Sequence, residues 1–240
     1  DKIQKGQLIQ DILKHIPYMD TAYFAGGEPL ITEEHYTILE EMIRLGRTDI
    51  LLRYNTNLSN LRFKNKDLLK LWSHFKQVKF NFSVDAVGAR NEYIRYPTKW
   101  ENVLQNLEIL DNTPSNVIVN IACAVQLLNV NHLPDLVTWK QHQNYKKINL
   151  PPYGAGLVGT HLVYLPSYLN VRVLPKHLKE LAAERMRSYT TNTRWLGFVD
   201  YMMAEDWSHK IPSTIEYLET CDASRRLDFR KVFTELNAMG

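Results

Sequence analysis

Two adjacent glycines followed by a carboxylate are the residues of this sequence best suited to chemistry. The stretch Tyr23-Phe24-Ala25-Gly26-Gly27-Glu28-Pro29-Leu30 predicts a short apolar strand that ends at the glycines, before a helix opening near Thr32. Glycine permits positive φ and has no Cβ, so a ligand can approach this backbone closely. Glu28 would offer an acceptor to a cationic group, and Pro29 would fix the direction in which the chain leaves. The alternative is an ordinary tight turn with an exposed glutamate.

Polar residues also follow the other strands that the sequence predicts, in Asn55-Thr56-Asn57, Ser83-Val84-Asp85 and Gln126 to Asn129. Ligands of β/α folds bind at the carboxyl ends of the strands, so we expect these residues to surround one site. The carboxylate suits an ammonium group, the amides and hydroxyl suit a ribose, and Arg95 suits a carboxylate. These are the parts of an amino-acid nucleoside. Each residue alone is equally typical of a helix cap or a turn.

An alternation of helices and strands must position these residues. Apolar residues at helical spacing predict an opening helix over Asp1–His15 and later helices with apolar faces at Ile38 to Ile43, closed by Gly46, at Leu68 to Phe75, at Trp100 to Leu107 and at Leu133 to Lys140. Strands are expected at Asp49–Tyr54, Gln77–Val84 and Val117–Gln126, a weaker one at His161–Leu165, a loop from Pro151 to Gly159 and helices after Pro175. This order predicts a parallel sheet with right-handed crossovers.

The predicted strands alternate apolar and polar residues. Val78, Phe80 and Phe82 alternate with Lys79, Asn81 and Ser83, and the strands before and after behave alike. A sheet covered by helices on both sides would be apolar on both faces, and a closed barrel would be filled with branched aliphatic residues. We therefore expect a curved sheet with helices outside and a polar concave face, as in a partial barrel that holds a large ligand. The alternative is an α+β sheet with one wet face.

Composition excludes several classes of function. The 240 residues suit a single α/β domain, and 45% hydrophobic with 23% charged residues is typical of a globular protein without a membrane-spanning run. Two cysteines indicate a reducing compartment, and we expect a cytoplasmic protein. A net charge of +3 gives no strong indication of nucleic-acid binding. We place His35 and His74 on helix surfaces, and the histidines show no metal-ligand spacing.

In this order and spacing, the motifs resemble those of the radical S-adenosylmethionine (radical SAM) enzymes, in the subgroup with a twitch-type C-terminal extension. The resemblance runs from the first helix to about Lys179 and rests on four stretches: Phe24 to Ile31, Tyr54 to Asn57, Phe82 to Asp85, and Glu92 to Tyr96 leading to Trp100-Glu101. It implies a partial (β/α)6-type barrel, a parallel curved sheet with helices outside, over residues 1–174. A helical extension is expected over residues 175–240.

The resemblance also implies a cofactor site. Gly26, Gly27 and Glu28, in the turn closed by Pro29, would receive the amino group of S-adenosylmethionine. The ribose and methionine carboxylate would be approached by the remaining polar residues, Asn55, Asn57, Ser83, Asp85, Arg95 and Asn129. With a 4Fe-4S cluster, such an enzyme cleaves S-adenosylmethionine reductively to a 5′-deoxyadenosyl radical, which abstracts hydrogen from a substrate, here unknown. An external electron donor such as a flavodoxin or ferredoxin is implied.

One departure from the family is large. Its members hold the cluster with a C-x3-C-x2-C loop after the first strand, and this sequence has no such loop. Cys123 and Cys221 are too few and too far apart to replace it. We expect that the loop and the strand before it are missing from this chain, which alone would be inactive. A non-catalytic module that binds S-adenosylmethionine or a nucleoside is the alternative. An unrelated phosphate-binding enzyme is disfavoured, since the turn has neither a P-loop lysine nor G-x-G-x-x-G.

Overall fold

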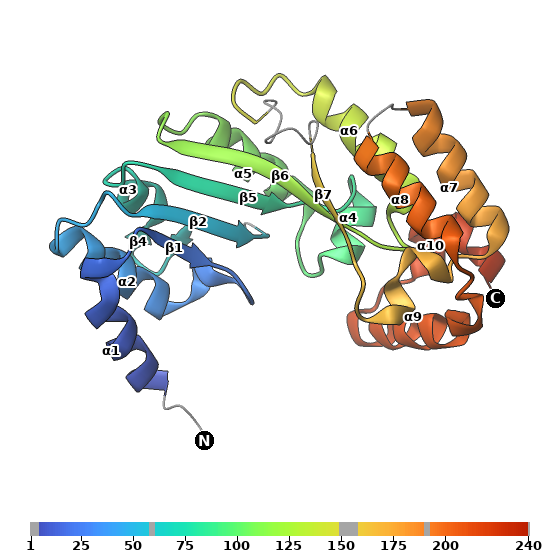
Figure 1. The fold of residues 1–240 in the computed structure, drawn as a ribbon, viewed down its shortest axis with the longest axis horizontal. Helices are drawn as coiled ribbons and strands as arrows, with labels where there is room; N and C mark the ends of the chain where they lie inside the picture. Colours follow the sequence, from blue (N-terminus) through green and yellow to red (C-terminus); the bar gives the residue numbers. More distant parts are fainter. Residues whose placement is uncertain (1–4, 58–60, 149–157, 190–192, 240) are drawn as a thin grey trace. The chain divides into compact units, whose positions relative to one another are not determined.

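The computed structural model describes residues 5–57, 61–148, 158–189 and 193–239. They form an α/β fold with a five-stranded sheet of order β1-β2-β5-β6-β7, flanked by helices, and a set of C-terminal helices. The arrows of β1, β2, β5 and β6 point the same way in Figure 1, and the registers are parallel. The strands are β1 (Thr21–Phe24), β2 (Leu51–Thr56), β5 (Val78–Ser83), β6 (Val117–Val125) and β7 (Gly159–Leu162). The predicted parallel sheet is confirmed.

Helices follow the strands in the expected alternation. The α-helices are α1 (Lys5–His15), α2 (Glu33–Arg44), α3 (Leu68–Trp72), α4 (Ala89–Ile94), α5 (Trp100–Asp111), α6 (Leu133–His142), α7 (Lys176–Tyr189), α8 (Thr193–Ala204), α9 (Ile211–Arg225) and α10 (Phe229–Val232). Short 3-10 helices are η1 (Ile16–Tyr18), η2 (Pro29–Ile31), η3 (Val130–His132), η4 (Ser167–Leu169), η5 (Val171–Val173), η6 (Ser208–Lys210) and η7 (Thr234–Met239). The helical character expected after Pro175 is confirmed.

The chain forms two compact units. Unit 1 comprises Asp1–Ser83, Glu101–Asn120 and Tyr145–Ile148, and unit 2 comprises Val84–Trp100, Ile121–Asn144 and Asn149–Gly240. Unit 1 therefore contains β1, β2, β5 and the first residues of β6, with α1, α2, α3 and most of α5. Unit 2 contains the rest of β6, β7, α4, α6 and the C-terminal helices, in which α7 packs against α6 and α8.

Strand alternation builds the core of unit 1 on one face of the sheet. Leu52, Tyr54, Phe80 and Phe82 are fully buried, whereas the residues between them are partly or largely exposed. Trp72 of α3 packs on Tyr54 and Phe80, with ring centroids 5.1 and 5.4 Å apart. The predicted separation into an apolar face and a polar face is confirmed for these strands.

Helix α2 ends at a left-handed glycine, as the sequence predicts. Gly46 has φ +71°, its N–H bonds the carbonyl of Ile43, and the N–H of Arg47 bonds the carbonyl of Met42. This pair of bonds is a Schellman ending, which satisfies carbonyls that the helix leaves open. In the second unit, the ending of α9 is also left-handed, at Arg226 with φ +56°.

Several local expectations differ from the structure. Strand β2 runs on to Thr56, beyond the Tyr54 boundary that we predicted, because Asn55 and Thr56 pair with Asn81 and Phe82 of β5. The β3 (Arg62–Phe63) and β4 (Lys66–Asp67) hairpin and α4 were not predicted from the sequence. The placement of His35 on a helix surface was wrong: the ring is buried and bonds the hydroxyl of Tyr54 at 2.9 Å. Most of the expected loop, residues 151–157, lies outside the described residues.

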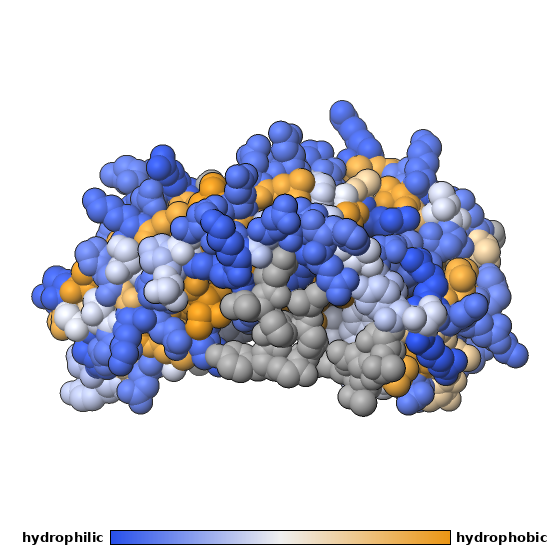
Figure 2. All heavy atoms as spheres, turned by 90° about the horizontal axis from the view of Figure 1, so that it is seen from above, coloured by the Kyte–Doolittle hydropathy of each residue, from blue (hydrophilic) through white to orange (hydrophobic). Residues whose placement is uncertain are grey.

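Hydrophilic side chains predominate on the face drawn in Figure 2, and hydrophobic ones gather there in smaller patches. The large apolar residues are mainly interior, although Tyr18, Tyr23 and Leu165 are more than half exposed. Among the described residues, no helix combines the length and apolar character needed to cross a membrane.

Candidate functional site

The glycine turn follows the carboxyl end of β1 and has an open surface. Gly26 and Gly27 have φ +85° and +54°, in the left-handed region that side chains rarely adopt. Both are exposed, and a Cβ built on either would meet no atom within 4 Å. The backbone of these two residues is therefore directly accessible to a ligand.

Glu28 ties this turn to the neighbouring strand end. Its Oε1 accepts hydrogen bonds from Oγ1 of Thr56 at 2.5 Å and from the N–H of Leu30 at 3.2 Å, and Oε2 accepts from the N–H of Asn57 at 3.1 Å. A carboxylate has about four lone-pair sites, so these three bonds leave room for one more donor. Glu28 is half-buried and is the N-cap of η2, in which Pro29 is buried. Glu28 thus both shapes the turn and keeps acceptor capacity beside it.

A row of side chains crosses the polar face of the sheet in unit 1. Asn55 donates to the hydroxyl of Tyr23 at 2.5 Å, Asn81 donates to Asn55 at 2.9 Å, and Asn120 donates to Asn81 at 3.4 Å. Tyr23 and Asn55 are exposed, and Asn81 and Asn120 are half-buried. The register places Asn55 opposite Asn81, which explains how amides from adjacent strands meet. Asn55 therefore points to the polar face, whereas the next residue, Thr56, faces Glu28.

Asp85 and Arg95 form an ion pair inside unit 2. The Nε of Arg95 lies 2.7 Å from Oδ2 of Asp85, and the N–H of Ala124 lies 2.7 Å from Oδ1. Asp85 is only 3% exposed, so both oxygens are held by protein donors in a dry environment. Arg95 is 26% exposed, and its terminal nitrogens are not used in this bond.

Asn129 is fully buried behind this ion pair. Its Nδ2 donates to the carbonyls of Asp85 and Ala124, both at 2.9 Å, and its Oδ1 accepts from the N–H of Gln126 at 2.8 Å. These bonds fix the loop after β6 to Asp85, within unit 2. Asn91 adds a further bond, in which its Oδ1 accepts from the N–H of Asp85 at 3.0 Å.

The site residues predicted from the sequence thus fall into two groups. In unit 1, Glu28 and Asn57 are joined directly, Gly26, Gly27 and Pro29 form the turn, and Asn55 and Ser83 lie on the polar face. In unit 2, Asp85, Arg95 and Asn129 form one network. Sequence reasoning missed Thr56 and Tyr23 as partners. The motif Asn55-Thr56-Asn57 could have indicated the separate role of Thr56, because strand alternation places the middle residue on the opposite face from its two neighbours.

The cysteines do not fit an iron-sulfur cluster. Cys123 and Cys221 are both buried, and Sγ of Cys123 lies 3.6 Å from Nδ2 of Asn129. Burial raises the pKa of the Cys123 thiol, which opposes the thiolate form that binds iron. Within the described residues, no group of three or more His, Cys, Asp or Glu side chains is arranged to hold a metal ion.

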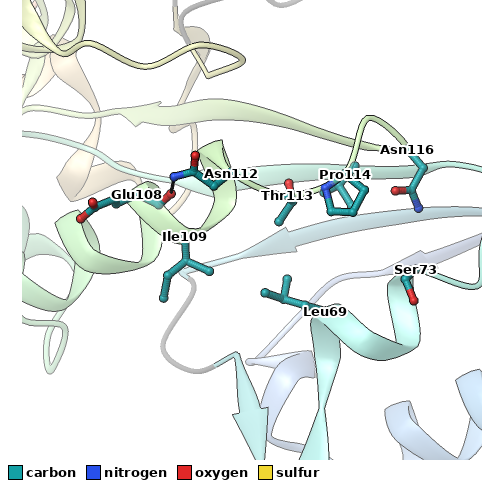
Figure 3. A pocket seen from close by; sticks show the side chains of 9 residues that line it. Leu69, Ser73, Glu108, Ile109, Asn112, Thr113, Pro114 and Asn116 are labelled. Carbon is teal, nitrogen blue, oxygen red and sulfur yellow. Dashed lines mark hydrogen bonds between the residues drawn. The ribbon is translucent and has the colours of Figure 1, made fainter.

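A pocket of about 460 Å³ lies elsewhere in unit 1, between α3, α5 and the segment leading into β6. Figure 3 shows Leu69 of α3 and Ile109 of α5 pointing toward one another across it. Its remaining lining residues are Ser73, Glu108, Asn112, Thr113, Pro114, Asn116 and Val117. Because Val117 begins β6, this pocket lies at the amino ends of the strands, away from the glycine turn. Ligands of β/α folds bind at the opposite ends, so we do not assign the site here.

No protein-family profile, curated protein or solved structure matches the chain.

Proposed function

We propose that this chain binds S-adenosylmethionine at the glycine turn and is part of a radical SAM enzyme of the twitch-containing subgroup. One observation carries the proposal: two exposed left-handed glycines with open space above them stand beside a carboxylate that the neighbouring strand end fixes in position. This combination suits a ligand whose ammonium group contacts bare backbone and a carboxylate together.

The chemistry of the turn suits the methionine end of the cofactor. An ammonium group has three donors, and the backbone carbonyls of the exposed residues Gly26 and Gly27, with the remaining acceptor site of Glu28, would supply three acceptors. Thr56 and Asn57 hold Glu28 before the ligand arrives, so less ordering is needed on binding. Asn55 presents an amide on the adjoining polar face, within the same strand end. Cofactor binding by Ser83, Asp85, Arg95 and Asn129 stays a prediction from the resemblance.

The proposed enzyme further requires residues that this sequence does not contain. Its two cysteines are buried and cannot hold a 4Fe-4S cluster. Three cysteine ligands would have to come from outside these 240 residues, and the cluster they held would supply the electron for reductive cleavage of S-adenosylmethionine. The role that we assign to the present chain is to bind and orient that cofactor. A cytoplasmic location, an unidentified substrate and an electron donor such as a flavodoxin or ferredoxin belong to the same proposal.

We further propose that the five strands are part of a partial (β/α)6-type barrel. The alternate burial of β2, β5 and β6 supports this architecture, since one face of each strand is packed and the other is more exposed. The proposed core ends near residue 174, and residues 175–240 form its helical extension.

The first test is titration of the chain with S-adenosylmethionine in a calorimeter. We expect saturable binding that weakens at least tenfold in Glu28→Gln and also weakens in Ser83→Ala, while both variants remain folded. Glu180→Gln is a matched control, because this exposed glutamate lies on α7 in unit 2. Equal affinity of the parent and both variants would show that the assigned site is wrong.

A non-catalytic S-adenosylmethionine or nucleoside-binding module is a second candidate, favoured by the absence of cluster ligands from this sequence. Anaerobic iron and sulfide reconstitution of the gene's full product separates the two. A 4Fe-4S spectrum with release of 5′-deoxyadenosine under reduction supports the enzyme. Cofactor binding without either result supports the module.

A further inference from the structure

The polar face of unit 1 carries positive charge on its central strands. Tyr23 of β1 is in register with Arg53 of β2, and Arg53 is in register with Lys79 of β5, so all three lie on this face. The other positions of these strands on the same face are uncharged: Thr21, Leu51, Asn55, Asn81 and Ser83. Two cations without an acid on the same strands make the face attractive to an anion.

Arg53 is positioned to bind an oxyanion. It is exposed, and its guanidinium carbon lies 5.5 Å from the centroid of the Tyr23 ring. Among the described residues, no carboxylate forms an ion pair with it, in contrast to Arg62 of the β3 strand, which pairs with Asp67 at 3.3 Å. A guanidinium offers a planar fork of donors that matches a carboxylate or a phosphate. Tyr23 limits the movement of this fork by a cation–π contact.

Neutral hydrogen-bonding groups stand directly beside the cations. Asn55 follows Arg53 by two residues on β2, and Asn81 follows Lys79 by two residues on β5. Asn81 donates to Asn55, and Asn55 donates to Tyr23, so both amides are ordered before a ligand arrives. Asn55 is also next to Thr56, which bonds Glu28 of the glycine turn. A molecule on this face would therefore lie beside the strand end assigned to the cofactor.

We propose that this face binds the substrate, an inference that rests on the proposed function. The substrate is an anion whose carboxylate or phosphate group pairs with Arg53. Its other polar groups bond the asparagine row, which is formed by Asn55, Asn81 and Asn120. The occupant is a small molecule or an end of a chain, since one guanidinium and one row of amides can recognise only a local group. Carboxylate and phosphate share this chemistry, and the experiment distinguishes them.

The test uses nitrogen-15 labelled protein and the side-chain signals of arginine Nε and asparagine Nδ2. Two matched pairs of probes are titrated: glutarate against glutaramide, and glycerol 3-phosphate against glycerol. We expect the charged member of at least one pair to shift the signals of Arg53, Asn55 and Asn81 saturably, with at least tenfold higher affinity than its neutral partner. The charged probe that binds more tightly identifies the group. Arg53→Gln should reduce that affinity at least tenfold.

Arg62→Gln is the control, because this arginine is exposed on the same unit but ion-paired, and it should leave binding unchanged. Equal response to charged and neutral probes, or unchanged affinity in Arg53→Gln with intact folding, overturns the substrate assignment. S-adenosylmethionine is titrated in parallel. If S-adenosylmethionine binds but the charged probes are not preferred, this inference alone is overturned. If the charged probes are preferred but S-adenosylmethionine does not bind, the proposed cofactor site alone is overturned.

Discussion

Gly27 and Gly46 share a left-handed backbone, with φ of +54° and +71°, and both have open space where a Cβ would stand. Gly46 ends helix α2, whereas Gly27 lies in the turn assigned to the cofactor. The two residues therefore allow the conformational cost of a side chain to be separated from its effect on a ligand.

Substitution of each glycine by alanine should cost about 1–2 kcal/mol of unfolding free energy, because a left-handed L-residue is strained even without a clash. Only Gly27→Ala should weaken S-adenosylmethionine binding, by tenfold or more, since its methyl group occupies the open space above the turn. Urea unfolding and calorimetric titration measure the two effects. Equal binding by both variants would contradict the assignment of the turn.

Removal of the Thr56 hydroxyl should loosen Glu28. Thr56 is buried and donates the 2.5 Å bond to Oε1, so we expect Thr56→Val to lose about 1.5–3 kcal/mol of stability, as for hydrogen bonds to charged groups. Cofactor affinity should fall as well, because Glu28 is then held by two backbone donors only. Thr37→Val is the control, since this exposed hydroxyl bonds the Glu33 carbonyl in the preceding turn of α2. A normal affinity in Thr56→Val would argue against preorganisation of Glu28.

Loss of Arg95 should leave a buried carboxylate without its cation. We expect Arg95→Met to destabilise unit 2 by about 3 kcal/mol, the lower end for a broken buried pair, because Asp85 is 3% exposed. The double variant Asp85→Asn with Arg95→Met should be more stable than Arg95→Met alone, since the amide oxygen still accepts from Ala124. Chemical unfolding of the double-mutant cycle provides the measurement. A double variant less stable than the single one would refute this account.

Acid should weaken the attachment of residues 145–148 in unit 1. Burial raises the pKa of Asp111, but bonds from the N–H groups of Lys146, Lys147 and Ile148 outweigh it and hold the pKa below its ordinary value of 3.8. The folded state thus binds fewer protons than the unfolded state. The ionised Asp111 carboxylate therefore stabilises the folded state fully above pH 3.8. This contribution is lost as the pH falls through the lowered pKa of the folded state.

Asp111→Asn should accordingly lose about 2 kcal/mol at pH 7, because the hydrogen bonds to a charged acceptor become neutral ones. The difference in unfolding free energy between Asp111→Asn and the parent should shrink as the pH falls below 3.8, because Asp111 of the parent then takes up a proton. Unfolding free energies at pH 3 to 7 check both statements. Glu41→Gln is the control, a half-buried carboxylate paired with the exposed Arg44 on α2, and it should change stability less. A constant difference between Asp111→Asn and the parent across this range would disprove the assignment.

The sequence predicted the sheet well because alternation is a local signal. Phe80 and Phe82 lie on one face and Asn81 on the other in any regular strand, so pairing partners were not needed. Local pattern did not predict the burial of His35. Its ring bonds the hydroxyl of Tyr54, a partner nineteen residues away in the sequence. Helix α4 was missed because it is short and lacks a sustained apolar period.

The site was predictable in its residue types and less so in its connections. Gly26 and Gly27 were expected to permit positive φ because they are glycines, and both adopt it. The bond between Glu28 and Thr56 spans 28 residues, and no spacing rule encodes it. Asn129 was placed near a ligand by resemblance, whereas both donors of its amide nitrogen are used by Asp85 and Ala124, and its oxygen accepts from Gln126. Its contribution to a ligand site stays a prediction.

The asparagine row of unit 1 also has a direction. Each amide nitrogen donates toward β1, from Asn120 to Asn81, from Asn81 to Asn55 and from Asn55 to Tyr23. Bond dipoles aligned head to tail strengthen one another, so the Tyr23 hydroxyl, which accepts at the end of the row, becomes a better donor of its own proton. The face is therefore polarised, with a proton-donating end at β1 and an accepting amide oxygen at β6. This arrangement of donor and acceptor would favour one orientation of a bound molecule, independently of the charged residues on the face.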